Sequence, residues 1–361
     1  MSDSTSPVPD LWRRLAIDPP RALGAPVGTA RLRVAPEDFR VDEQLGFEPA
    51  GAGPHLLLRV RKRGANTDWV ARQLASAAQV RPMDVGYAGL KDRHAVTTQW
   101  YTVPAGKRSA ADWAGLTGDG YEVIEAHAHH RKLPRGALDA NRFELRLRDF
   151  AAGRDAVDAR LRAIAARGVP NYFGPQRFGR DLSNLRPYLA EVTDRPRRLD
   201  EYALSAGRSL LFNAVLARRI DDGTWTTLLA GDLANLDSRG SVFAVDEPDA
   251  ELAARVERLD VHASGPLWSR DGTTATGPVA VLERDVADLL APVTARLDRE
   301  RLSSARRALR LAVRELDWGW EADGALRVSF LLRSGGYATA VLRELIDVAD
   351  DSGEAAVVSA A

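Results

Sequence analysis

The chain has 361 residues, of which 45% are hydrophobic and 28% are charged, and it is long enough for two domains of an ordinary globular protein. It contains no cysteine, which excludes disulfides, thiolate metal sites and cysteine nucleophiles. The 50 basic residues balance 50 acidic ones, a mild argument against a nucleic-acid partner, although basic residues cluster locally, as in Arg59–Arg63. The longest apolar runs are too short to span a bilayer, and residues 1–20 lack the apolar core of a signal peptide. We therefore expect a cytoplasmic protein.

The first part of the chain predicts strands followed by a helix. Residues 29–43 begin with a strand, pass a turn at Pro36–Asp38 and continue through Phe39, for which a core position is the simplest interpretation. His55–Arg63 alternates apolar and charged residues, which is typical of a half-buried strand. Asn66 then offers an N-cap for an amphipathic helix.

The segment Gly86–Trp100 is the most informative part of the sequence. A run ending at Leu90 and a second run from Ala95 predict two strands, joined by the four polar residues Lys91–His94. A tight turn there would direct these side chains away from a sheet edge, and neighbouring cations that fold back on Asp92 would favour its ionised form. A solvated charged turn and a functional loop are both compatible with this pattern.

Histidines and a second alternating strand follow a segment, 104–120, that we expect to be a loop. His127, His129 and His130 have a spacing that would place two of them on one strand face, but no motif supplies further ligands, so a metal site is the less favoured interpretation. Asn141 opens a strand in which Phe143, Leu145 and Leu147 share one face.

The middle of the chain is more helical. Helices are predicted over Arg154–Arg167, Leu204–Ile220 and within Val286–Arg310. Between the first two, Gly168–Gly179 is dense in glycine and proline and predicts a shaped loop. This loop could hold Gln176 and Arg177 toward a phosphate backbone, but we favour a role in packing or as a hinge.

The C-terminal part returns to sheet. Leu326, Val328, Phe330 and Leu332 alternate before a turn, and a helix is predicted from Ala338.

Several of these segments carry a resemblance to one family. Ala88–Thr97 resembles the signature of the TruD family of tRNA pseudouridine synthases. Four further segments resemble family motifs in the same order, namely Pro36-x-Asp-Phe-x-Val-x-Glu43, Asn141-x-Phe143, Asn171–Gly179 and Gly336–Leu345. The resemblance extends over nearly the whole chain. One small departure is Ala140, where the family usually has glycine.

The resemblance implies a fold and a domain arrangement. The expected fold is α/β of the α+β type, a pseudouridine synthase catalytic domain with a mixed, mainly antiparallel sheet and a smaller inserted α/β TRUD domain. The catalytic domain would be discontinuous, formed by residues 1–167 and 312–361, and the insertion would be residues 168–311.

The resemblance also implies site residues and a reaction. Asp92 would be the catalytic carboxylate, and Arg33 would be a basic residue beside it. Substrate-binding residues would be Phe39, Asn141, Phe143, Tyr337 and Lys91. Pseudouridine formation breaks the C1′–N1 bond of a uridine, turns the base and rejoins it through C5, which requires no cofactor and no metal. Because the target lies in folded RNA, its nucleotide must be flipped out, with aromatic side chains replacing the lost stacking.

The resemblance implies that the substrate is uridine 13 in the D-arm of tRNA, and whether Asp92 attacks C1′ or removes the C2′ proton stays open. We expect a monomer without membrane association. Two alternatives remain: a non-catalytic RNA-binding or RNA-clamping protein of the same fold, and a two-carboxylate glycosidase in which Glu37 or Glu43 assists Asp92.

Overall fold

The computed structural model describes residues 7–189, 198–237 and 240–351, and the chain forms two compact units. The sheet unit comprises Pro26–Leu161 and Val313–Ala361, and the helical unit comprises Met1–Ala25 and Arg162–Ala312. The described residues 7–25 therefore cluster with the helical unit, whereas the boundaries expected from the sequence placed them with the catalytic part.

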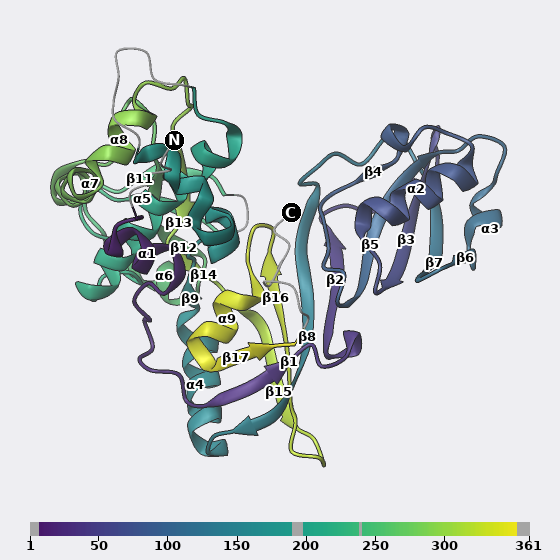
Figure 1. Cartoon of the computed structure of the whole chain (residues 1–361), viewed down its shortest axis with the longest axis horizontal. Coiled ribbons are helices and arrows are strands. Elements are labelled where there is room, and N and C mark those ends of the chain that lie inside the picture. Colours follow the sequence, from purple (N-terminus) through teal and green to yellow (C-terminus); the bar gives the residue numbers. More distant parts are fainter. Residues whose placement is uncertain (1–6, 190–197, 238–239, 352–361) are drawn as a thin grey trace, which may run out of the picture. The chain divides into compact units, whose positions relative to one another are not determined.

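The sheet unit is built on one mixed sheet (Figure 1). Its main path runs β15-β16-β8-β2-β5-β3-β7-β6, with β1 and β17 attached to β8 through β1, and β4 attached to β5. The pairs β2–β5 and β1–β17 are parallel and the others are antiparallel, which confirms the predicted mainly antiparallel sheet. The strands are β1 Thr29–Leu32, β2 Phe39–Leu45, β3 His55–Arg63, β4 Gly86–Tyr87, β5 Val96–Pro104, β6 Thr117–Gly118, β7 Tyr121–His129, β8 Leu138–Ala151, β15 Arg314–Trp320, β16 Leu326–Arg333 and β17 Asp347–Asp350.

Alternation in sequence becomes alternation in burial at the centre of this sheet. On β8 the apolar side chains of Phe143, Leu145 and Leu147 are buried, and they lie opposite Phe330, Val328 and Leu326 of β16. Both strands were predicted from this pattern and are confirmed. The strand predicted up to Leu90 is present only as the two-residue β4, because Ala88–Leu90 already belong to the following loop.

Short helices complete the sheet unit. The predicted helix after Asn66 is α2, which belongs to the sheet unit (Figure 1). Its Val70 and Leu74 belong to one buried cluster with residues of β3, β5 and β7. The segment 104–120, expected to be a loop, includes a short helix and the strand β6. The helices are α2 Thr67–Ala78, α3 Ala110–Trp113 and α9 Ala338–Leu345, with 3-10 turns η1 Pro36–Asp38 and η2 Pro82–Asp84, and α4 Arg154–Arg167 runs from this unit into the other.

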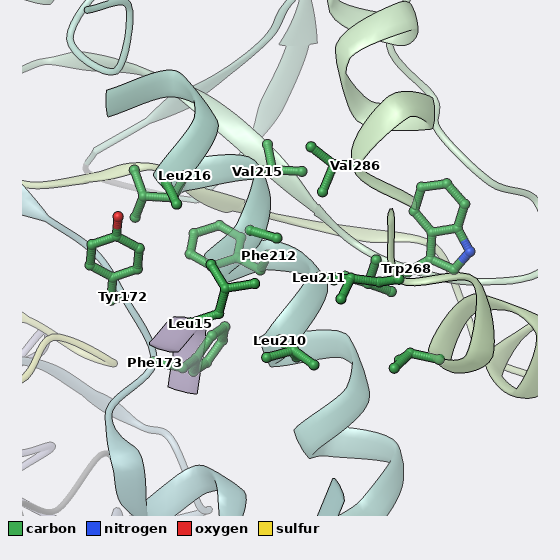
Figure 2. Packing of buried hydrophobic residues seen from close by; sticks show 14 of the residues in the cluster. Leu15, Tyr172, Phe173, Leu210, Leu211, Phe212, Val215, Leu216, Trp268 and Val286 are labelled. Atoms are coloured by element: carbon green, nitrogen blue, oxygen red, sulfur yellow. The ribbon is translucent and has the colours of Figure 1, made fainter. Parts of the chain in front are cut away.

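The helical unit is organised around α5, Glu201–Asp221, which confirms the helix predicted over Leu204–Ile220. Figure 2 shows its apolar side chains packed against Leu15, Phe173, Trp268 and Val286. The surrounding elements are the helices α1 Asp10–Ile17, α6 Ala250–Glu257, α7 Gly277–Leu289 and α8 Ala291–Leu297, the 3-10 segments η3 Pro175–Phe178 and η4 Arg180–Tyr188, the sheet β11-β10-β12-β13 with strands Val242–Ala244, Leu233–Leu236, Val261–Leu267 and Ala305–Ala308, and the pair β14 Arg310–Leu311 with β9 Val169–Pro170.

One predicted helix is wrong in its second half. Within Val286–Arg310 the helices end at Leu297, and Ala305–Ala308 forms the strand β13, which pairs with Ser264–Leu267 of β12. Sheet pairing here overrides the local preference of an arginine-rich segment for helix. In the part of the chain that the structure describes, no helix combines the length and apolarity needed to cross a bilayer.

Candidate active site

The loop that follows β4 carries Asp92 into a buried position. Lys91 and Asp92 are only 7% and 8% exposed, whereas Arg93 is exposed and His94 half-buried. The interpretation of Lys91–His94 as a turn with four solvated side chains is therefore wrong for Lys91 and Asp92. Burying a carboxylate and an ammonium group is unfavourable unless each has a partner, so their partners identify what the loop is built to hold.

Asp92 is paired with Arg33. Nη2 of Arg33 lies 3.0 Å from Oδ2 of Asp92, and Nη1 lies 2.5 Å from Oδ2 of Asp350 on β17. The Arg33 guanidinium also lies over the ring of Phe39, 4.0 Å from its centroid, which adds a cation–π contact in a desolvated setting. Arg33 follows β1 directly and has a positive φ of 59°, so local backbone geometry directs it toward the loop. The basic residue expected beside Asp92 is thus in contact with it.

Lys91 forms a second buried ion pair. Its Nζ lies 2.7 Å from Oε2 of Glu43, and their side chains are 3% and 0% exposed. The other oxygen of Glu43 accepts a hydrogen bond from the backbone N–H of Trp100. Lys91 was expected to contact the substrate, but in this structure its side chain joins the loop to β2 and β5.

Hydroxyl and amide groups brace the same loop. The Lys91 N–H donates to Oγ1 of Thr67, the first residue of α2, and Gln99 donates from Nε2 to the Gly89 carbonyl. Thr67 and Tyr101 both donate to Oε1 of Gln99, so the network is closed inside the sheet unit. A loop fixed by this many buried hydrogen bonds can hold a carboxylate in one position.

Lys62 is a site residue that the sequence interpretation missed. It is 1% exposed, and its Nζ donates to the carbonyl oxygens of Ala65, Lys91 and Asp92 at 2.8, 3.2 and 2.7 Å. Burial lowers the pKa of Lys62 to about 7, against the opposing effect of the Asp92 charge.

A signal for Lys62 was present in the strand pattern. It lies two residues after the buried Val60 on β3, on the face that a period of two directs into the core. Its neighbours Arg61 and Arg63 point outward and pair with Glu122 and Glu37. Of the three consecutive basic residues Arg61, Lys62 and Arg63, only Lys62 therefore contacts the loop that carries Asp92.

The aromatic and amide residues lie on the adjoining strands. Phe39 and Phe143 are 0% and 2% exposed and meet edge to face, and Phe143 also stacks on Phe330. Both rings therefore occupy core positions, and Phe39 lies against the Arg33 guanidinium. Asn141 is 4% exposed and lies opposite Glu43 in the β2–β8 register, which places it beside the residue that holds Lys91.

Asn141 and Tyr337 retain features suited to a ligand. Oδ1 of Asn141 is buried without a hydrogen-bond partner among the described residues, an unfavourable state that a ligand donor would relieve. Tyr337 is half-buried and immediately precedes α9, on the connection between β16 and β17. The structure thus brings Arg33, Phe39, Phe143, Asn141, Lys91 and Asp92 into one connected set.

The residues of the alternative interpretations are arranged differently. Glu37 is exposed and paired with Arg63, whose hydrogen bond lowers the pKa of Glu37, the opposite of what a glycosidase general acid needs. Glu43 is already paired with Lys91. His127 pairs with Glu125, and no group of three or more potential metal-ligating side chains occurs within residues 7–189, 198–237 and 240–351.

Comparisons with known proteins give one consistent result. A family model described as tRNA pseudouridine synthase D (TruD) matches residues 23–187 and 186–345. The chain is 46% identical over 334 residues to the tRNA pseudouridine synthase D of Methylococcus capsulatus, covering 91% of this chain and 94% of that protein. It is 46% identical over 350 residues to the protein of the same name from Xanthomonas axonopodis pv. citri, covering 92% and 95%.

A solved structure supports the fold. The crystal structure of a protein described as the putative tRNA pseudouridine synthase D of Methanosarcina mazei superposes with a TM-score of 0.71, at 20% identity, covering 94% of this chain and 98% of that one.

Proposed function

The chain belongs to the TruD family of tRNA pseudouridine synthases, and from that premise we propose that it converts uridine 13 in the D-arm of tRNA to pseudouridine with Asp92 as its catalytic carboxylate. It is an isomerase, and its substrate class is tRNA. The observation that carries the assignment of Asp92 is its buried ion pair with Arg33, inside a loop that Lys62, Lys91 and Thr67 hold in place.

The proposed chemistry needs one ionised carboxylate at the sugar. Asp92 either attacks C1′ of the flipped uridine or removes the proton from C2′, and in both cases the C1′–N1 bond breaks and uracil departs as an anion. The base then turns and C5 bonds to C1′, which breaks the Asp92–C1′ bond in the first route and is accompanied by return of the proton to C2′ in the second. C5 loses its proton to solvent and N1 takes one up, so product and substrate have the same composition. Arg33 neutralises the buried carboxylate before the substrate enters and keeps it aligned.

The remaining site residues would recognise the nucleotide. Oδ1 of Asn141 is a buried acceptor without a partner among the described residues, and a uracil N–H or a ribose hydroxyl would satisfy it. Tyr337 is half-buried and would face the base. Phe39 and Phe143 lie inside the core and would act through Arg33 and the strand positions they support; direct stacking on the base would require one of these rings to become exposed.

The domain roles form part of the same proposal. The sheet unit carries every residue named above, so we assign catalysis to it, and we assign the part of the helical unit within residues 168–311 to the inserted TRUD domain. We further propose a cytoplasmic monomer that works without a cofactor or a metal, since the isomerisation consumes no electrons and no energy source.

The decisive substitution is Asp92→Asn. We expect it to lower tritium release from tRNA carrying 5-tritiated uridine by at least about a thousandfold, because the Asn amide can act neither as the nucleophile nor as the base that the proposed step requires. Binding of tRNA should survive, since Asn keeps the size of the side chain. A matched control is Asp84→Asn, which removes a carboxylate that pairs with the exposed Arg81.

Three outcomes would contradict parts of this proposal. Full tritium release by the Asp92→Asn protein would exclude Asp92 as the catalytic group, whereas a wild-type protein that binds tRNA without releasing tritium would favour the non-catalytic RNA-clamping alternative. Mapping of pseudouridine in tRNA exposed to the wild-type protein tests the position independently. Pseudouridine elsewhere than position 13 would refute the D-arm assignment and leave the synthase activity standing.

A further inference from the structure

A polar pocket adjoins the catalytic loop on the side of Arg93. It has a volume of about 340 Å³, and its lining includes Arg63, Trp69, Arg72, Arg93 and Asp119. All of these residues belong to the sheet unit. We call this the Arg93 pocket. Arg93 directly follows Asp92 in the sequence, so the pocket lining includes the residue next to the proposed catalytic carboxylate.

The walls of the Arg93 pocket are tied to the site by hydrogen bonds. Its lining includes Ala65, whose carbonyl accepts from the buried Lys62, and Lys62 also holds the carbonyls of Lys91 and Asp92. Nε of Arg93 lies 3.4 Å from the Gly64 carbonyl, a long contact that leaves most of the guanidinium available. The pocket and the catalytic loop are thus fixed to the same lysine.

Charge at the Arg93 pocket favours an anion. The lining contains three arginines, Arg63, Arg72 and Arg93, and one carboxylate, Asp119. Arg63 is neutralised by Glu37, but the Arg72 side chain forms no hydrogen bond or ion pair with a described residue. The N-terminus of α2 also meets the pocket at Asn66, whose side chain makes no capping bond, so the positive end of the helix dipole is directed there.

An aromatic side chain completes the lining. Trp69 is half-buried, with Tyr121 against it edge to face at 6.1 Å between ring centroids. Arginine guanidinium groups beside an indole are the combination that proteins use to bind single-stranded nucleic acid, with cations on the phosphate and the ring under a base.

We propose that the Arg93 pocket binds a nucleotide that flanks the target uridine, with its phosphate on Arg72 and Arg93 and its base against Trp69. This inference rests on the proposed function, because it assigns RNA as the ligand. Once the target nucleotide is flipped, its neighbour loses a stacking partner and its phosphate swings outward. A basic aromatic pocket one residue from Asp92 would hold that neighbour and align the flipped ribose.

The test is the salt dependence of tRNA binding by an Arg72→Ala, Arg93→Ala double variant. Both arginines are proposed to contact one phosphate, so the double variant should lower the slope of log Kd against log salt by about 1. The KM for tRNA should rise about tenfold at moderate salt, and kcat at saturating tRNA should fall less than KM rises. Arg81→Ala, which removes an exposed arginine paired with Asp84, should leave slope and KM unchanged.

Further variants separate binding from folding. Arg72→Lys, Arg93→Lys keeps both charges and should restore the slope, and Trp69→Phe should bind tRNA better than Trp69→Leu. A wild-type slope in the double alanine variant, with wild-type circular dichroism, would overturn the inference. So would equal losses in the alanine and lysine variants.

Binding and turnover report on different claims. If wild-type protein binds tRNA but forms no pseudouridine, the proposed activity fails, while the slopes still decide the pocket. If wild-type protein is active and the double variant keeps its slope and KM, the pocket alone fails.

Discussion

At the scale of single residues, Lys62 links the core of the sheet to the loop that carries Asp92. Its ammonium group has three protons and three carbonyl acceptors, at Ala65, Lys91 and Asp92. Loss of one proton leaves two donors for three acceptors, so the fit of the loop depends on the charge of this lysine. The groups that face it are Asp92, whose charge raises its pKa, and Lys91, whose charge lowers it together with burial, the largest cause.

Burial of Lys62 predicts a pH-dependent stability. Its pKa is about 7 in the folded protein and 10.5 in the unfolded chain, so between these values the unfolded chain binds more protons. The destabilisation caused by Lys62 is therefore complete below pH 7 and is relieved as pH rises through this window. We expect wild-type protein to gain stability relative to a Lys62→Met variant between about pH 7 and 10, by up to about 1.4 kcal/mol per pH unit.

Urea unfolding of the two proteins across this range measures the difference. Arg61→Met is a matched control, because Arg61 precedes Lys62 on β3 but is exposed and pairs with Glu122. The difference in the free energy of unfolding between wild type and Arg61→Met should be the same at every pH. Parallel curves for wild type and Lys62→Met would show that Lys62 titrates normally, and the description of its burial would be wrong.

The sequence indicates which residues lie together at the candidate site better than it indicates how exposed they are. Asp92 and Asn141 were identified from motifs that resemble those of the family, and Arg33 from its position before the Pro36–Glu43 motif. Phe39 and Phe143 were open to two interpretations, because alternation assigns a residue to a face but does not tell whether another layer covers that face. In the structure both rings are covered, at 0% and 2% exposure.

At the scale of elements, one asparagine joins three segments of the helical unit. Asn213 on α5 is fully buried, accepts a hydrogen bond from the Phe173 N–H and donates to the carbonyls of Phe173 and Leu15. It thereby fixes α1 and the loop 168–179 to α5. Phe178 of the same loop is also fully buried, which supports packing as a function of this loop.

Removal of this link should destabilise the helical unit. Asn213→Ala leaves one N–H and two carbonyls buried without partners, and each unsatisfied group costs about 1 kcal/mol or more. We expect the free energy of unfolding to fall by about 3 kcal/mol in urea titrations. Asn235→Ala is the control, since the Asn235 side chain makes one hydrogen bond within the described residues, to the Gly240 carbonyl, and its loss should cost about 1 kcal/mol. Equal losses in the two variants would contradict the assigned role.

Element boundaries were predictable where local pattern and tertiary pairing agree. His55–Arg63 and Arg154–Arg167 have the bounds expected from sequence, because their own periodicity matches the surface that each one covers. Ala305–Ala308 does not, because its state depends on β12, a strand some 40 residues earlier with which it pairs. A partner strand this far away in the sequence cannot be identified from the residues that surround Ala305–Ala308.

At the scale of the whole molecule, each unit has a hydrophobic core of its own. The buried cluster around α5 contains only residues of the helical unit, and the cluster between α2 and β3 contains only residues of the sheet unit. Net charge is zero over the chain, so affinity for RNA must come from local groups such as the Arg93 pocket rather than from an overall field.

Separate cores predict that thermal unfolding is not a single two-state event. We expect calorimetry to resolve two transitions, of which Asn213→Ala lowers one by about 5 to 10 °C and leaves the other in place. Glu43→Gln should lower the second, because it leaves the Lys91 ammonium buried without its partner, a loss that typically costs about 3–5 kcal/mol. The sheet unit carries Asp92, so loss of synthase activity on heating should follow the transition that Glu43→Gln shifts. If both substitutions instead move one common transition by similar amounts, the two cores unfold as one cooperative body, and activity would then report on the helical unit as strongly as on the sheet.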